Sequence, residues 1–371
     1  MGIGSLKCTI IGAGITGLAT AWRLSAAGHQ VSLIDPQEGP ATSTVAAGML
    51  GPTAEHAPGE DLLTSLLLVA SQRWKLFAQD LELETQLAIG LRESGTIMLG
   101  FDADDRRALE RSAAFNISSG LKLEALKAPE IALRLANLAP AVTSGYFLPG
   151  DHQVDPRAVM TALTKACADS GVEQHRARAL RIEGSAVILD DGRTITGDRI
   201  VLATGAGARG LVSEHAACLD AVRPVKGITL RLRDHGASMV ETTIRGLVEG
   251  RASYIVPRSD GEIVIGASSL ERGFDARAEA GSIADLLGDA RKLFPVLDEA
   301  SFEGFDVGFR PATADHAPIV GRLGQAPIFA ALGSYRNGIL LAPLIAEAIT
   351  QEIGDGLPHE SFAAFPTGRF G

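Results

Sequence analysis

The sequence predicts an α/β protein that combines a parallel sheet with a second, mainly antiparallel sheet. An apolar strand, a glycine turn, a helix and a second apolar strand follow one another within residues 7–35, which is the order of a βαβ unit. Between Arg223 and Gly273 apolar and polar residues alternate, as in antiparallel strands with one buried face. The chain has 371 residues, 46% of them hydrophobic, so more than one domain is expected.

The glycines of the first unit have the spacing of a dinucleotide-binding turn. Gly12 permits a tight turn, Gly14 lets backbone N–H groups approach a pyrophosphate, and Gly17 lets the helix pack closely on the strand. The start of the helix adds unpaired donors and a partial positive charge. Asp35 ends the second strand, where a carboxylate accepts hydrogen bonds from an adenosine ribose. These features predict a Rossmann-like nucleotide-binding domain.

Composition limits the other classes of function. The net charge is −10 without a long basic run, so we expect neither nucleic acid nor an anionic membrane surface as a partner. No stretch reaches the ~18 apolar residues of a membrane span. Cys8, Cys167 and Cys218 lack a CxxC spacing and the histidines are scattered, so we expect no disulfide framework and no metal. With no signal-peptide pattern before the first strand, we expect a cytoplasmic protein.

A run of small residues follows the first unit. After a turn-rich stretch at 36–40, residues 41–50 read ATSTVAAGML. Such a run could place its backbone against a flat ligand, with the hydroxyls of Thr42 and Ser43 near a phosphate, or it could be an ordinary helix start. Residues 61–87 then predict a long amphipathic helix. Its apolar face comprises Leu62, Leu63, Leu66, Leu67, Ala70, Trp74 and Phe77.

The middle of the chain alternates further helices and strands. Asp155 is a predicted N-cap, with Pro156 in the first turn of a helix that ends near Gly171. A turn at 190–192 predicts a hairpin, and the apolar residues after Arg199 predict a buried strand that returns beside the first unit. The other predicted elements are a strand at 95–100 and helices at 102–116, 129–138 and 276–294.

Two arginines near the C-terminus lie in apolar, small or turn-forming surroundings. Arg310 lies in GFRPATAD and Arg336 in SYRNGILLAP. A guanidinium in such surroundings pairs with an internal carboxylate or binds one from a ligand. Asp315 is a candidate internal partner of Arg310, and the local sequence leaves both alternatives open.

Seven motifs together resemble the FAD-dependent D-amino-acid oxidase superfamily, and within it they are most similar to the glycine oxidases of thiamine biosynthesis. The resemblance covers nearly the whole chain, with the motifs in the family's order. It implies a Rossmann-like FAD-binding domain at 1–88, 146–220 and 304–371. An α+β substrate-binding domain with a mainly antiparallel sheet is implied at 89–145 and 221–303. The motifs are GAGITG, TSTVAAGML, VDPRAV, RPVKG, SYIVPR, GFRPATAD and SYRNGILLAP.

The resemblance also implies roles for individual residues. Arg310 matches the arginine that binds the substrate carboxylate, Tyr254 a tyrosine that helps to hold it, and Arg336 a second arginine at the mouth of the site. Glu55 lies on a loop that borders the site in the family, but a solvated surface acid is an equal alternative. No cysteine lies near Arg310, which favours non-covalent FAD. The implied FAD-binding residues are Gly12, Gly14, Ile15, Thr16, Gly17, Asp35, Thr42, Ser43, Ala47, Gly48, Met49, Ala179, Gly205, Gly333, Ser334, Tyr335, Arg336, Asn337, Gly338, Ile339 and Leu340.

The implied activity is the oxidative deamination of glycine or another small amino acid or amine. A hydride passes from Cα to flavin N5, which converts the substrate to an imine. Dioxygen then reoxidises the flavin and is reduced to hydrogen peroxide. One alternative is a D-amino-acid or opine dehydrogenase that passes electrons to a quinone. Two further alternatives are a flavin-binding subunit without turnover of its own and a nicotinamide dehydrogenase. We also expect a homo-oligomer.

Overall fold

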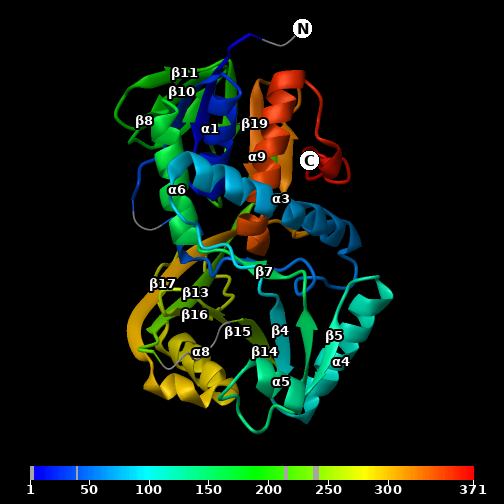
Figure 1. Ribbon diagram of the computed structural model, residues 1–371. Coiled ribbons are helices and arrows are strands. Elements are labelled where there is room, and N and C mark those ends of the chain that lie inside the picture. Colours follow the sequence, from blue (N-terminus) through cyan, green and yellow to red (C-terminus); the bar gives the residue numbers. More distant parts are fainter. Residues whose placement is uncertain (1–3, 39–40, 213–215, 237–241) are drawn as a thin grey trace.

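The computed structural model describes residues 4–38, 41–212, 216–236 and 242–371 (Figure 1). One sheet lies in the upper half of Figure 1 with α1 and α9, and a second sheet lies in the lower half. Gly39 and Pro40, at the end of the predicted turn-rich stretch, fall outside the described residues. No helix in the described ranges is long and apolar enough to cross a bilayer.

The first sheet has the order β18-β19-β12-β1-β2-β8. β1 pairs in parallel with both β2 and β12, which confirms the βαβ unit and the returning strand. Only the edge strand β18 is antiparallel to its neighbour. The strands are β1 (Lys7–Ile11), β2 (Gln30–Ile34), β8 (Glu173–His175), β12 (Arg199–Leu202), β18 (Ile319–Arg322) and β19 (Ile328–Leu332).

Four helices pack together beside this sheet: α1 (Ile15–Ala26), α3 (Asp61–Thr85), α6 (Pro156–Asp169) and α9 (Gly338–Asp355). Local capping explains where α6 begins, because Asp155 accepts hydrogen bonds from the backbone of Arg157 and Ala158. α3 buries the predicted apolar face with one exception. Leu62 is 64% exposed, since it lies about 100° around the helix from Leu63, at the edge of the buried stripe.

The second sheet has the order β17-β13-β16-β15-β14-β4-β6-β5. The strands between residues 223 and 266 are antiparallel to their neighbours, as the alternating pattern predicts, whereas β14 and β4 are parallel. The strands are β4 (Thr96–Gly100), β5 (Glu124–Lys127), β6 (Ser144–Leu148), β13 (Arg223–Arg233), β14 (Thr243–Val248), β15 (Arg251–Pro257), β16 (Glu262–Gly266) and β17 (Ser301–Ala312).

Strands β6 and β17 extend across the predicted domain boundaries near residues 146 and 304, because both pair within the second sheet. The division into domains itself stays a prediction. Further helices lie beside the second sheet in the lower half of Figure 1. They are α4 (Ala103–Ser118), α5 (Ala128–Arg134) and α8 (Ala280–Leu293), and α5 and α8 are shorter than predicted.

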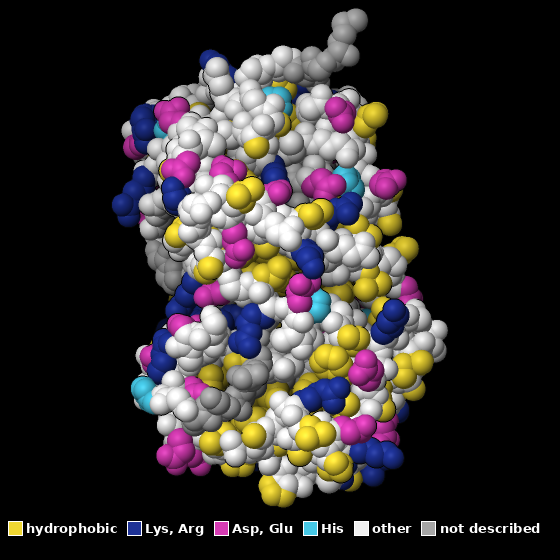
Figure 2. All heavy atoms as spheres, in the orientation of Figure 1, with side chains coloured by type: hydrophobic (Ala, Val, Ile, Leu, Met, Phe, Trp, Pro, Cys, Tyr) yellow, Lys and Arg dark blue, Asp and Glu magenta, His cyan; other side chains and the backbone are white. Residues whose placement is uncertain are grey.

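The remaining elements are short. The turn at 190–192 joins β10 to β11 in the predicted hairpin. The elements are β3 (Met49–Leu50), β7 (His152–Gln153), β9 (Ala179–Glu183), β10 (Ala186–Leu189), β11 (Thr194–Thr196), α2 (Thr42–Val45), α7 (Ala216–Asp220), and the 3-10 helices η2 (Pro295–Glu299), η3 (Tyr335–Asn337) and η4 (Glu360–Phe362). On the face shown in Figure 2, acidic and basic side chains are interspersed over both halves.

Candidate functional site

A cavity of about 1020 Å³ is lined by residues of both sheets. The lining residues from the first sheet are Ile11, Ile34, Ala203 and Leu332. They lie at the carboxyl ends of β1, β2, β12 and β19. Ligands of open parallel sheets bind outside these ends. The cavity therefore lies where the βαβ unit predicts a nucleotide.

The turn after β1 packs closely against neighbouring backbone, which only glycine allows at two of its positions. Gly12 has a φ of 105°, and a Cβ on it would clash with the backbone of Ala203. A Cβ on Gly17 would clash with the carbonyl of Gly12. Helix α1 thus begins close against the strand, with its first N–H groups near the cavity.

Asp35 and Ser43 lie at this turn and hydrogen-bond to its backbone. Asp35 Oδ2 accepts from the Ala13 N–H at 2.8 Å, and Ser43 Oγ accepts from the Ile15 N–H at 3.0 Å. Both side chains line the cavity. The polar backbone, the hydroxyl and the carboxylate fit the pyrophosphate and ribose of a dinucleotide.

Most of the predicted cofactor-binding residues meet at this cavity, although they come from distant parts of the chain. Gly17 and Leu340 do not line it. Leu340 is 1% exposed and its carbonyl accepts from Trp74 Nε1 at 3.0 Å, so it belongs to the helical core. The predicted residues on the wall are Gly12, Gly14, Ile15, Thr16, Asp35, Thr42, Ser43, Ala47, Gly48, Met49, Ala179, Gly205, Gly333, Ser334, Tyr335, Arg336, Asn337, Gly338 and Ile339.

Arg310 lines the cavity from β17. Its Nη1 donates to the carbonyl of Ser268 at 3.0 Å, and a Cβ on Gly227 would lie 2.5 Å from the same nitrogen. Asp315 pairs with Arg369 at 2.7 Å, so the alternative in which Asp315 neutralises Arg310 is wrong. Within the described ranges no carboxylate forms an ion pair with Arg310.

Tyr254 lines the cavity beside Arg310. On β15 it pairs in register with Arg245 of β14, so the two side chains lie on the same face of the sheet. Burial raises the pKa of Tyr254, and the field of Arg310 only partly opposes this effect. The phenol therefore keeps its proton and remains a hydrogen-bond donor.

Glu55 lines the cavity and forms ion pairs with two arginines. Its Oε1 lies 2.5 Å from Arg245 Nη1, and its Oε2 lies 3.2 Å from Arg336 Nε. Burial opposes ionisation, but Arg245 and Arg336 outweigh it and hold the pKa of Glu55 below its usual value. Its side chain is only 11% exposed, so the alternative of a solvated surface acid is wrong.

Asp151 holds the loop that carries Glu55. It is buried, and it accepts hydrogen bonds from the backbone of Thr53 at 3.1 Å and of Ala54 at 2.8 Å. Burial raises the pKa of Asp151 to about 6. The loop thus depends on a carboxylate that titrates in mildly acidic solution.

The segment around Tyr335 also lines the cavity, and it contacts the loop that precedes α3. Tyr335 stacks on His316 with 4.8 Å between the ring centroids, and His316 Nδ1 lies 2.7 Å from Glu60. The guanidinium of Arg336 lies 5.2 Å from the Tyr335 ring. Because Glu55 and Glu60 precede α3 on one loop, the Glu55–Arg336 ion pair and the Glu60–His316 hydrogen bond tie that loop to the C-terminal part of the site.

The prediction from sequence missed Arg245. A lone arginine in TIRGLV, an otherwise apolar strand, is the same signal that singled out Arg310 and Arg336. Strand pairing then brings Arg245 next to Tyr254. Arg245 therefore joins Arg310 and Arg336 on the cavity wall, and Glu55 pairs with Arg245 and Arg336.

Comparison with known proteins identifies the class. A model of the FAD dependent oxidoreductase family matches residues 7–352, so the chain belongs to this family and is an FAD-dependent oxidoreductase. The family, the fold class and the cofactor predicted from sequence are thereby confirmed.

Individual relatives narrow the class further. The chain is 33% identical to glycine oxidase from Geobacillus kaustophilus over 344 residues, which is 90% of this chain and 89% of the relative. The crystal structure of glycine oxidase from Geobacillus kaustophilus matches with a TM-score of 0.89 and 29% identity, covering 98% of this chain and 99% of that one. The bifunctional protein ThiO/ThiG from Synechocystis sp. is 33% identical over 97% of this chain, which spans about half (53%) of its length.

Proposed function

We propose that the chain catalyses the oxidative deamination of glycine or another small amino acid or amine, with FAD held non-covalently in the cavity and dioxygen as the electron acceptor. The observation that carries the proposal is Arg310, a guanidinium on the cavity wall without a carboxylate partner among the described residues. An arginine in this state is suited to bind the carboxylate of an amino acid through two parallel hydrogen bonds. The similarity to glycine oxidase along nearly the whole chain supports the same substrate class.

The residues of the βαβ unit are proposed to hold the adenosine end of FAD. The carboxylate of Asp35 accepts from the ribose, and the turn from Gly12 to Gly14 with the start of α1 binds the pyrophosphate. Residues of the segments 42–49 and 333–339 line the cavity and would hold the flavin, and the start of α9 at Gly338 would offer it a partial positive charge. The chemistry that bound FAD would supply is hydride transfer from the substrate, with dioxygen as the final electron acceptor.

The other side chains orient the substrate. Arg310 binds its carboxylate, and the protonated phenol of Tyr254 donates a second hydrogen bond to the same group. These two contacts fix the position of Cα and of the amino group in the cavity. Holding the reacting atoms in one geometry raises the rate because less entropy is lost on reaching the transition state. Glu55 is already paired with Arg245 and Arg336, so we assign it to balancing their charge rather than to removing a proton.

An absorption spectrum followed by a peroxide-coupled screen tests this proposal. The purified protein should show the bands of oxidised flavin, and glycine, sarcosine or a small D-amino acid should generate hydrogen peroxide. Substrate that bleaches the flavin under anaerobic conditions without giving peroxide in air would favour the dehydrogenase alternative. A protein with flavin that no amine or amino acid reduces would contradict the proposal. A role in thiamine biosynthesis stays a prediction from the resemblance, and a cytoplasmic location and a homo-oligomeric state stay predictions from the sequence.

A further inference from the structure

The segment Ala41–Leu50 forms one wall of the cavity but has little regular structure of its own. α2 contains four residues and β3 two. Residues 41–43 and 45–49 of the segment line the cavity. A helix this short cannot satisfy its own carbonyls, so the position of the wall depends on donors from elsewhere in the chain.

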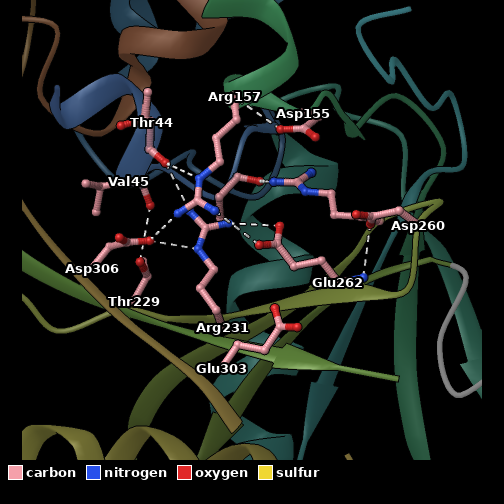
Figure 3. Close-up of polar contacts among 12 residues, drawn as sticks. Thr44, Val45, Asp155, Arg157, Thr229, Arg231, Asp260, Glu262, Glu303 and Asp306 are labelled. Atoms are coloured by element: carbon pink, nitrogen blue, oxygen red, sulfur yellow. Dashed lines mark hydrogen bonds and ion pairs between the residues drawn. The ribbon is translucent and has the colours of Figure 1, made fainter. Parts of the chain in front are cut away.

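Arg231 of β13 supplies the central donor (Figure 3). Its Nη2 donates to the Thr44 carbonyl at 3.0 Å, its Nε to Asp306 at 2.8 Å, and its Nη1 to Glu262 at 3.0 Å. Asp306 lies on β17 and Glu262 on β16, the strands that flank β13 on its two sides. The planar guanidinium is therefore held from both sides, and its remaining edge meets Thr44.

A second guanidinium, that of Arg157 on α6, shares all three acceptors. It donates to Asp306 at 2.7 Å, to Glu262 at 3.4 Å and to the Thr44 carbonyl at 3.3 Å. Two arginines and two carboxylates balance in charge, which offsets the cost of burying Arg231, whose side chain is 6% exposed. Figure 3 shows both guanidinium groups directed at the same carboxylates.

Two further carbonyls of the segment are held in the same way. Thr229 donates to the Val45 carbonyl at 3.2 Å, and Arg258 Nη2 donates to the Ala47 carbonyl at 2.5 Å. At its other end the segment reaches the nucleotide-binding turn, because Ser43 Oγ accepts from the Ile15 N–H. A shift of the carbonyls at 44–47 would therefore also move Ser43 relative to the start of α1.

We propose that Arg231 is a positioning residue for FAD. It does not line the cavity, and it acts by holding the Thr44 carbonyl and, through it, the wall formed by Ala41–Leu50. The inference rests on the proposed place of FAD in this cavity and is independent of which amine is oxidised. Weaker FAD binding and an altered flavin environment are the expected consequences of its loss.

The test compares Arg231→Lys with the matched control Arg233→Lys in the full-length protein. Arg233 lies two residues further along β13 and is held by Glu303 at 2.9 Å and Asp260 at 3.1 Å, away from the segment. Lysine keeps the charge but lacks the planar fork that meets three acceptors. Losing bonds of this kind should raise the Kd of FAD about tenfold in Arg231→Lys, whereas Arg233→Lys should stay within about twofold of the wild type.

Two further readouts separate positioning from general stability. In Arg231→Lys the visible circular dichroism of the bound flavin should change, and the amides of residues 42–49 should exchange faster with and without FAD. Equal Kd and equal visible spectra in the two variants, with only a lower Tm for Arg231→Lys, would assign Arg231 a structural role and overturn the inference.

Arg157→Lys serves if Arg231→Lys does not fold, because the side chain of Arg157 is 45% exposed. It should shift the same readouts in the same direction by a smaller factor, and wild-type values in all of them would overturn the inference. Asp35→Ala distinguishes the two proposals. If it leaves the Kd of FAD unchanged, the place of FAD in the cavity is wrong. If it weakens FAD binding while Arg231→Lys does not, only the role of Arg231 fails.

Discussion

Asp315 pairs with Arg369, with 2.7 Å between Oδ2 of the acid and Nε of the arginine. Arg369 also donates to the carbonyl of Ala317 at 2.8 Å, so it anchors the turn that follows β17. This pair engages Asp315, the candidate internal partner of Arg310 in the sequence. Arg310 is left with the neutral carbonyl of Ser268, and its charge is available to an anionic ligand.

Replacing Arg310 by alanine should reduce turnover without releasing FAD. Loss of a charge-assisted, two-point contact costs at least ~2–3 kcal/mol, which corresponds to a fall in kcat/KM of roughly 30- to 150-fold. Steady-state kinetics with a peroxide-coupled assay give this value, and the visible spectrum reports the retained flavin. Asp315→Asn is the control, since it breaks the pair with Arg369 and should lower the Tm while leaving kcat/KM nearly unchanged. Wild-type kinetics in Arg310→Ala would remove this residue from the site.

Replacing Asp35 by alanine should weaken FAD binding. The carboxylate lines the cavity and organises the turn through the Ala13 N–H, so its loss removes a hydrogen bond to a charged group and raises the Kd of FAD roughly tenfold or more. Fluorescence titration of the apoprotein with FAD measures the change. Glu173→Ala, on the neighbouring strand β8 and with a side chain 70% exposed, should retain wild-type affinity. Equal affinities in the two variants would contradict the ribose contact.

Replacing Glu55 by glutamine should destabilise the protein. Arg245 would remain largely buried without its counter-ion, which costs roughly 3 kcal/mol of unfolding free energy. Urea denaturation measures the loss, and adding Arg245→Met to Glu55→Gln should restore part of it. Glu93→Gln is the control, because Glu93 pairs with Lys75 at 3.5 Å on the surface and should change stability by less than ~1 kcal/mol. Equal stability of the two single variants would show that Glu55 is not needed to neutralise Arg245.

Asp151 should make stability fall as the pH rises from about 4 to about 6. Burial raises the pKa of Asp151 from 3.8 to about 6, so between these values the folded protein binds more protons than the unfolded chain. By linkage the unfolding free energy then decreases with pH, by roughly 3 kcal/mol in total, and the loss is complete above pH 6. Asp151→Asn does not titrate in this range, so the stability of the wild type relative to this variant should fall between pH 4 and pH 7. A difference that stays constant over this range would contradict the raised pKa.

Most of the fold prediction was based on short patterns of residues that are adjacent in the sequence. The glycine turn after β1, the N-cap at Asp155 and the hairpin turn at 190–192 each depend on a few adjacent residues, and the structure confirms all three elements. The alternation after Arg223 predicted antiparallel strands because burial of one sheet face repeats every second residue. The prediction that Leu62 belongs to the buried face of α3 was wrong, because the edge of a buried helical stripe depends on what packs against it.

By itself the sequence determined the nucleotide-binding unit, the two kinds of sheet and a set of candidate residues that meet, with few exceptions, at one cavity. Only the tertiary structure decided how their charges are paired. Glu55 pairs with Arg245, 190 residues away, and Thr44 accepts from Arg231, 187 residues away. Such pairs form when the two sheets are brought together, and that arrangement is the sum of many apolar contacts across the chain. A short motif shows that a charge is present, but the partner that neutralises it depends on the whole fold.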